Sequence, residues 1–152
     1  MTINSGMQKI VFHNERNKIH PLKGKIKKYK NWLMAIAAEE GGEIDEIHFI
    51  FCDDDYVLEI NRNFLNHDYF TDIITFPYSQ EKNKLKADIY ISIDTVRSNA
   101  EEYNESFENE LNRVMAHGLL HLLGYNDKSE FESELMRKME DGCVLLWNSE
   151  NY

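Results

Sequence analysis

The sequence predicts a single α+β domain in which a four-stranded mixed β-sheet packs with about five helices. In the first 93 residues, stretches with apolar side chains at every second position alternate with stretches of helical spacing, and the rest of the chain shows helical spacing alone. The length of 152 residues and the 42% of hydrophobic residues are typical of one globular domain. We therefore treat residues 1–152 as one domain and expect residues 1–7 to be flexible.

The N-terminal half is expected to alternate strands and helices. Apolar residues are bunched at 8–14 and alternate at 43–53, which predicts two strands. Helical spacing predicts one helix over 24–42, stopped by two glycines, and another over 54–65, capped by Asp53. The inward face of the second helix is expected to hold Val57, Ile60 and Phe64.

Two more strands and three helices are expected to complete the chain. Alternation predicts strands at 71–78, ended by Pro77, and at 86–93. The helices are expected over 94–104, 106–124 and 129–148. Ser106 begins the middle helix with a capping box, and Gly124 ends it. Three aromatic residues at helical positions are predicted to be core: Phe107, Phe131 and Trp147.

Composition and charge argue against several classes of protein. No apolar run approaches the roughly 18 residues that a membrane span needs, and the N-terminus lacks a basic start and an apolar signal core. The cytoplasm is therefore the expected location, with no membrane partner. The net charge of −10 argues against general binding to nucleic acid. Cys52 and Cys143 lie in apolar stretches and are predicted to be small buried hydrophobes.

The charge is unevenly distributed along the chain. Residues 16–30 carry seven basic residues and no acidic one, whereas the C-terminal third is acidic. Such a stretch can contact phosphate groups, or it can be a solvated helix face, and the composition does not favour either. We take Lys25, Lys27 and Lys28 as candidate phosphate-binding residues.

Two histidines four residues apart are the strongest chemical signal in the chain. His117 and His121 lie on one face of a helix, so both imidazoles can point at one ion. Gly124 can turn the chain back, which allows Asp127 to supply a third ligand for zinc. A pair at this spacing is often merely packed or solvated, but four neighbouring leucines predict a buried helix, where histidines need partners. Gly118 stands where a metalloprotease has its glutamate base, although close helix packing would also explain a glycine there.

The stretch HGLLHLLGYND resembles the signature of the YbeY family of bacterial ribosomal-RNA maturation endoribonucleases. NHDYFTDIITFPY and ADIYIS resemble two further family stretches, and the resemblance runs from about Ile44 to the C-terminal helix. It implies a zincin-like fold with the metal site at the C-terminal end of a central helix and one zinc ion per chain. It also implies a single-strand-specific, metal-dependent endoribonuclease that matures the 3′ end of small-subunit ribosomal RNA. The implied partners are ribosomal RNA, the small ribosomal subunit and ribosome-associated proteins, without a small-molecule cofactor.

The sequence departs from the family pattern at two places. Asp127 stands where the family has histidine, and Asn126 where it has aspartate; zinc accepts a carboxylate oxygen in place of an imidazole. Leu65 replaces an arginine that is implicated in handling RNA, and His67 replaces a lysine. Arg62 lies one helical turn before Leu65 and can supply the charge from the same face.

Positive charge near the scissile phosphate would stabilise the developing negative charge. The resemblance makes Arg62, His67 and Arg113 the candidate catalytic residues, and it makes Lys25, Lys27 and Lys28 candidate RNA-binding residues. A purely structural role stays open for two of them: His67 can be a turn residue, and Arg113 can form a salt bridge to Glu108 or Glu110. The nucleophile is either an activated water or the adjacent 2′-hydroxyl, and the sequence favours neither.

Two other functions stay open at this point. A metal-dependent hydrolase of another bond, such as a peptide bond, is the first, and the absence of a glutamate at Gly118 counts against it. A non-catalytic ribosome-assembly factor with a structural metal is the second, and both Leu65 and the acidic charge favour it.

Asp72, at the start of the third strand, can orient a ligand histidine or hold the turn, and we expect the structural role.

Overall fold

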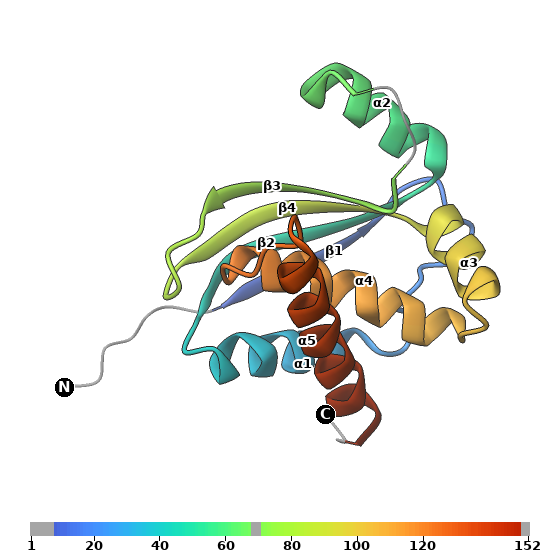
Figure 1. Cartoon of the computed structure of the whole chain (residues 1–152). Helices are drawn as coiled ribbons and strands as arrows, with labels where there is room; N and C mark the ends of the chain where they lie inside the picture. The colour runs from blue at the N-terminus through green and yellow to red at the C-terminus, as the bar shows by residue number, and fades with distance from the viewer. Residues whose placement is uncertain (1–7, 68–70, 150–152) are drawn as a thin grey trace.

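The computed structural model describes residues 8–67 and 71–149 (Figure 1), so the expectation about residues 1–7 lies outside the described residues. The elements follow the predicted order, and the predicted class, a four-stranded mixed sheet with five helices, is confirmed. The elements are β1 (Lys9–Asn14), α1 (Ile26–Glu39), β2 (Ile44–Cys52), α2 (Asp54–Leu65), β3 (Ile73–Ser79), β4 (Leu85–Ser92), α3 (Ile93–Glu102), α4 (Phe107–Leu122) and α5 (Glu130–Ser149). None of the helices in these ranges is long and apolar enough to cross a membrane.

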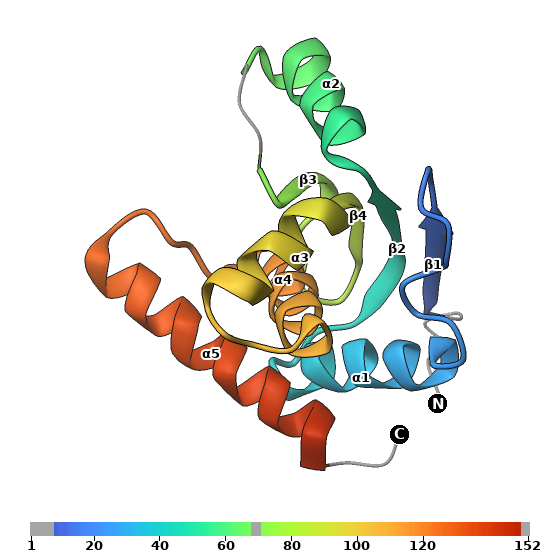
Figure 2. The same ribbon diagram turned by 90° about the vertical axis from the view of Figure 1, so that its right-hand side faces the viewer.

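The sheet has the order β1-β2-β4-β3, and only β3 runs antiparallel to its neighbour. Side chains alternate between its two faces. Phe49 of β2 pairs in register with Phe12 and with Ile89; Phe49 and Ile89 belong to the main core beneath the sheet, and the partly buried Phe12 packs against it. Figures 1 and 2 show α1 and α4 on that face, whereas α2 lies on the opposite side over one end of the sheet. The sheet therefore has one covered face and one face that is largely open.

Aromatic residues connect α1 to α5. Tyr29 stacks on Trp147 with 4.0 Å between ring centroids, and Trp32 Nε1 donates a hydrogen bond of 2.9 Å to the Cys143 carbonyl. Both tryptophans are almost fully buried, and burying such a side chain contributes about 1.5–3 kcal/mol or more. Cys52 and Cys143 are buried and unpaired, as predicted. This packing fixes α5 against α1 and α4, which matters below because α5 contributes to the candidate site.

Some predictions from the sequence are wrong. β3 does not end at Pro77, which lies opposite Ala87, and the register shifts between Pro77 and Ser79. An edge strand tolerates proline because the missing N–H can face away from the sheet. Phe64 and Phe131 are 68% and 75% exposed, although helical spacing predicted them inward. Spacing defines a helix face but does not show whether another element covers it.

Candidate metal centre

Helix α4 is bounded as the sequence predicts. The Ser106 side chain accepts a hydrogen bond of 3.0 Å from the Asn109 backbone N–H, which satisfies one exposed donor at the helix start. Gly124, with φ of +105°, turns the chain after the last residue of the helix. The turn brings the following loop, with Asp127, back towards the helix that carries the two histidines.

Gly118 packs directly on the sheet. A Cβ atom there would lie 3.0 Å from Ile73 Cδ1 and 3.3 Å from Ile89 Cδ1, which is closer than side chains normally approach. The close-packing explanation of this glycine is therefore the one that the structure supports. The packing holds α4 against β3 and β4 and leaves no room for a glutamate base at this position.

Three potential ligand atoms converge just beyond this contact. His117 Nε2 lies 3.3 Å from Asp127 Oδ2, and His121 Nε2 lies 3.5 Å from the same oxygen. One atom from each of the three residues falls within 4.8 Å of the others. In a tetrahedral zinc site with ligands about 2.0–2.1 Å from the ion, neighbouring ligand atoms are roughly 3.3 Å apart. The donor set and its spacing therefore fit a divalent metal ion, and they leave a fourth position for water or substrate.

Glu140 on α5 orients one of these histidines, and no pattern in the sequence indicated this contact. Its Oε2 lies 2.6 Å from His117 Nδ1, while its Oε1 accepts a hydrogen bond of 3.3 Å from Arg113. Arg113 also forms an ion pair of 2.7 Å with Asp141. A carboxylate on Nδ1 holds the proton there and leaves Nε2 to face the metal. Glu140 is 23 residues from His117 on another helix, so only the docking of α5 on α4 reveals the contact.

Acidic groups dominate the electrostatics of the centre. Burial works to lower the pKa of His117, but the hydrogen bond and charge of Glu140 outweigh burial, so that pKa is raised. Burial raises the pKa of Asp72, although the nearby His117 works in the opposite direction. The Asp72 backbone carbonyl accepts a hydrogen bond of 2.9 Å from the Ser92 N–H, and the structural role of its carboxylate stays a prediction. The raised pKa of His117 reflects the negative charge of Glu140 and Asp127 next to it, and these surroundings favour a cation.

The remaining candidate residues lie in different surroundings. Arg113 contacts Glu140, which in turn contacts His117, and it forms ion pairs with Glu140 and Asp141. Its charge also acts on Glu110, one of the two glutamates considered from the sequence. Arg62 is exposed in the last turn of α2. His67 follows that helix, and its backbone N–H donates a hydrogen bond of 3.0 Å to the Asn61 carbonyl within it. Both views show α2 across the sheet from α4 (Figures 1 and 2). The catalytic roles of these residues stay predictions.

The α1 lysines are partly engaged in contacts within the protein. Lys25 forms an ion pair with Glu108, and Lys28 Nζ lies 4.0 Å from the ring centroid of Trp147. Lys27 is exposed. Two of the three lysines therefore help to hold α1 against α4 and α5, and an RNA-binding role for the three stays a prediction.

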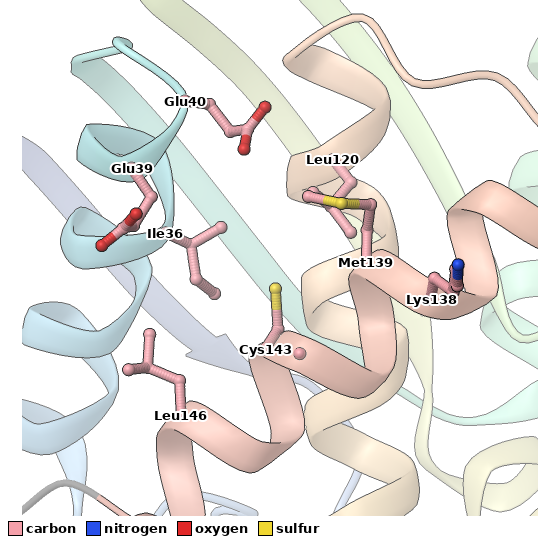
Figure 3. Close-up of a pocket in the computed structure, with 9 residues that line it drawn as sticks. Ile36, Glu39, Glu40, Leu120, Lys138, Met139, Cys143 and Leu146 are labelled. Atoms are coloured by element: carbon pink, nitrogen blue, oxygen red, sulfur yellow. The ribbon is translucent and has the colours of Figure 1, made fainter.

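A separate apolar cleft of about 270 Å³ lies between α1 and α5 (Figure 3). None of the three potential ligands lines it. Glu40 at its rim accepts a hydrogen bond of 2.6 Å from the Tyr125 hydroxyl, two residues before Asp127. The cleft is therefore separate from the metal centre, and its residue Glu40 helps to hold the loop that carries Asp127. Its other labelled lining residues are Ile36, Glu39, Leu120, Lys138, Met139, Cys143 and Leu146.

The sheet, its covering helices and the ligand set define an α+β protein with a candidate mononuclear metal centre. Residues 10–147 match the family model described as Endoribonuclease YbeY. The chain belongs to this family.

Similar proteins agree with this assignment. Endoribonuclease YbeY of Cytophaga hutchinsonii is 51% identical over 117 residues, which cover 77% of this chain and 82% of the relative. The protein of the same name from Phocaeicola vulgatus is 48% identical over 122 residues, or 80% of this chain and 88% of the relative. The solution structure of a Thermotoga maritima protein has a TM-score of 0.60 and 29% identity, with 91% of this chain and 92% of that chain covered.

Proposed function

We propose that this protein is a metal-dependent, single-strand-specific endoribonuclease that matures the 3′ end of small-subunit ribosomal RNA. The observation that carries the proposal is the convergence of His117, His121 and Asp127, with 3.3 and 3.5 Å between the aspartate oxygen and the histidine nitrogens. Membership of the endoribonuclease family supports RNA as the substrate. The geometry supports the metal, and the family supports the bond that is cleaved.

Side chains around the metal centre orient its ligands and set its charge. A divalent ion held by these ligands supplies Lewis-acid stabilisation of negative charge on a phosphoryl oxygen. His117 keeps its proton on Nδ1, because Glu140 accepts a hydrogen bond there. Arg113 in turn holds Glu140 in place and partly neutralises it. Asp127 brings a formal negative charge to the ligand set, which balances part of the charge of a cation.

We propose one zinc ion per chain as the metal. Two imidazoles and one carboxylate are a donor set that zinc accepts. Because oxygen donors also suit harder ions, manganese should compete better here than at a site of three imidazoles. Metal analysis of the purified protein distinguishes these ions, and a content of one zinc per chain is the expected result.

The proposed setting is the cytoplasm, with ribosomal RNA and the small ribosomal subunit as partners and ribosome-associated proteins as further contacts. The name of the similar proteins supports RNA as a partner. The cytoplasm and the ribosomal partners are proposed from the family resemblance of the sequence. The partners become testable by pull-down from ribosomal fractions with and without ribonuclease treatment. Recovery of small-subunit RNA with the parent protein is the expected outcome.

Two alternatives define the controls. A peptide hydrolase of the glutamate-dependent kind is disfavoured because Gly118 packs against Ile73 and Ile89. A non-catalytic assembly factor would keep the metal and bind RNA without cleaving it. The test incubates the purified protein with a small-subunit RNA fragment that has a single-stranded 3′ extension, and with casein, each with and without chelator.

The expected result is cleavage in the single-stranded extension, lost with chelator and restored by zinc or manganese. The His117→Ala variant should be inactive under all these conditions. Metal-dependent cleavage of casein would favour the peptide hydrolase, and RNA binding without cleavage under any metal would favour the assembly factor.

A further inference from the structure

A groove with basic walls lies at the opposite end of α4 from the metal centre. The loop between β1 and α1 forms one wall with Arg16, Lys18 and Ile19, and α3 forms the other with Arg97. Phe107, the first residue of α4, also lines the groove. The groove has a volume of about 510 Å³. We call it the basic groove.

The charge of the basic groove is opposite to that of the protein as a whole. Arg16, Lys18 and Arg97 face one acidic lining residue, Asp94, in a chain of net charge −10. The ion pairs of the two arginines are long, and both arginine side chains are exposed: Arg16 lies 3.8 Å from Asp53, and Arg97 lies 4.0 Å from Asp94. Such pairs contribute little and open readily towards another anion. The groove is therefore suited to an anionic ligand.

Aromatic rings orient both guanidinium groups. The guanidinium carbon of Arg16 lies 5.0 Å from the ring centroid of Tyr56, and that of Arg97 lies 5.4 Å from the centroid of Phe107. Contact with a ring face leaves the N–H groups at the edge of the guanidinium plane, where they can donate to a phosphate. Ile19, which is 70% exposed, adds apolar surface next to these donors. Single-stranded nucleic acid needs this combination of cations and apolar or aromatic faces.

The position of the groove in the sheet supports a ligand site independently of its charge. The loop with Arg16 follows β1, and α3 with Arg97 follows β4, so both walls lie beyond the carboxyl ends of parallel strands. The chain leaves β1 towards α1 and leaves β2 towards α2, on opposite sides of the sheet (Figures 1 and 2). In open sheets with parallel strands, ligands commonly bind beyond the carboxyl ends of the strands, which is where both walls of the groove lie.

We propose that the basic groove binds backbone phosphates of the single-stranded RNA substrate, away from the bond that is cleaved. His117 is ten positions after Phe107 on α4, so the groove lies about 15 Å along the helix axis from the metal centre. A strand held there is positioned for cleavage some nucleotides further along. The substrate class rests on the proposed endoribonuclease function, whereas the anion-binding groove rests on its own residues.

The test measures binding separately from cleavage. The His117→Ala background removes a metal ligand but leaves the basic groove intact, and a labelled, unstructured oligouridylate is the probe. Lys18→Glu and Arg97→Glu are combined in this background. The matched control combines Lys84→Glu and Lys138→Glu, two exposed lysines that do not line the groove and that give the same change in net charge. Fluorescence anisotropy at several salt concentrations gives the affinity and its salt dependence.

The groove variant should bind at least about tenfold more weakly at low salt, because two phosphate contacts are lost. The slope of log affinity against log salt should become shallower by about 1.4, at about 0.7 for each single-strand phosphate contact. Arg97→Gln alone should lower the slope by about 0.7. The control should retain the slope of its background. Equal affinity and slope in groove variant and background, or equal weakening in the control, overturns the proposal.

The outcomes separate the groove from the proposed function. If the protein cleaves RNA but the groove variant binds as its background does, the groove proposal fails and the function stands. If the protein cleaves no RNA with any metal but the groove variant loses binding, the groove stands and the catalytic proposal fails. Melting curves of all variants check the fold, and the exposed Arg97→Gln change provides the result if the double variant is unfolded.

Discussion

Two pairs of histidines in this protein look alike but differ in what they can hold. His117 and His121 lie on successive turns of α4, with 4.5 Å between ring centroids. His13 and His48 lie on the neighbouring strands β1 and β2, with 5.1 Å between ring centroids. Each pair has a carboxylate within hydrogen-bond distance of one ring. Both pairs therefore combine two imidazoles with a nearby carboxylate.

The pairs differ in which nitrogens are occupied. His48 contacts His13 Nε2 through its Nδ1 at 2.8 Å and Glu46 through its Nε2 at 2.7 Å, so both nitrogens are in use. His117 uses Nδ1 for Glu140, while its Nε2 points towards Asp127 together with that of His121. A metal site needs converging lone pairs, and a carboxylate on the far nitrogen helps rather than competes. The direction of the ring nitrogens therefore determines which of the two pairs can hold a metal ion.

The largest expected difference between the pairs is in metal content. His117→Ala should lose the bound metal, whereas His13→Ala should retain it in full, and atomic absorption of the purified variants measures both. Bound metal stabilises the folded state by about 4 kcal/mol when it is present at about a thousand times its dissociation constant. Chelator should therefore lower the melting temperature of the parent and of His13→Ala but not of His117→Ala. Metal retained in His117→Ala would remove the distinction between the pairs.

The second prediction concerns Asp127, the ligand that departs from the family pattern. Asp127→Ala should lose most metal affinity, because its Oδ2 is the atom on which both histidines converge. Asp127→His should still bind zinc, and its hydrolytic pH profile should move to lower pH, because a neutral ligand leaves more charge on the ion. Asn126→Ala is the neighbouring control and should bind zinc as the parent does. Full metal content in Asp127→Ala together with loss of metal in Asn126→Ala would mean that Asn126, and not Asp127, is the third ligand.

The third prediction compares two acids next to Arg113. Glu140→Gln should weaken metal affinity by about 10–100-fold, the usual effect of removing a group that orients a ligand histidine. Asp141→Asn removes the other acidic partner of Arg113 without touching His117, and should have a much smaller effect. Competition with a fluorescent zinc chelator measures both affinities. Equal losses in the two variants would mean that charge, and not orientation of His117, is what Glu140 supplies.

The sequence predicted the parts of this fold that depend on local patterns. The strands, the helices and the caps at Asp53 and Ser106 follow from alternation, helical spacing and capping chemistry. The ligand group was predictable because His117 and His121 lie on one helix and a glycine turn returns Asp127 to them.

The unpredicted features depend on how distant elements dock. Glu140 meets His117 only because Trp32, Trp147 and their neighbours fix α5 beside α4. The exposure of Phe131 has the same origin, because nothing in its own helix shows what lies opposite that face. A contact between side chains that lie 23 residues apart, or on different strands of a sheet, leaves no periodic pattern in the sequence. No local pattern therefore reveals it.

The fourth prediction uses the raised pKa of His117. Burial works to lower this pKa, but Glu140 raises it overall, so the metal-free ring holds a second proton up to a higher pH than an ordinary histidine. In the metal-free protein, the associated stability is present below the ordinary pKa and is lost as pH rises through the raised one. Zinc binds the neutral ring, so zinc affinity should fall as pH drops through the raised pKa.

In Glu140→Gln the fall in zinc affinity should move to lower pH, although the affinity at high pH is weaker. Zinc titrations between about pH 6 and pH 8 bracket the ordinary histidine pKa of about 6.5 and measure the change. The His48→Gln variant, with the other pair altered, should leave the profile in place. An unchanged profile in Glu140→Gln would mean that Glu140 does not control protonation of His117.

The smallest expected effect is that of Glu46→Gln, the counterpart of Glu140→Gln in the other pair. Its hydrogen bond to His48 lowers the pKa of Glu46, so the associated stability is present above the ordinary glutamate pKa and is lost as pH falls through the lowered one. Because this carboxylate lies at the surface, solvent screens the interaction and the melting temperature at neutral pH should change little. Metal content should equal that of the parent. The small difference in melting temperature between parent and variant should disappear in acid, where the parent carboxylate is protonated as well. A large loss of stability or of metal in Glu46→Gln would show that the strand pair depends on its carboxylate as the helix pair does, and the contrast between the two pairs would fail.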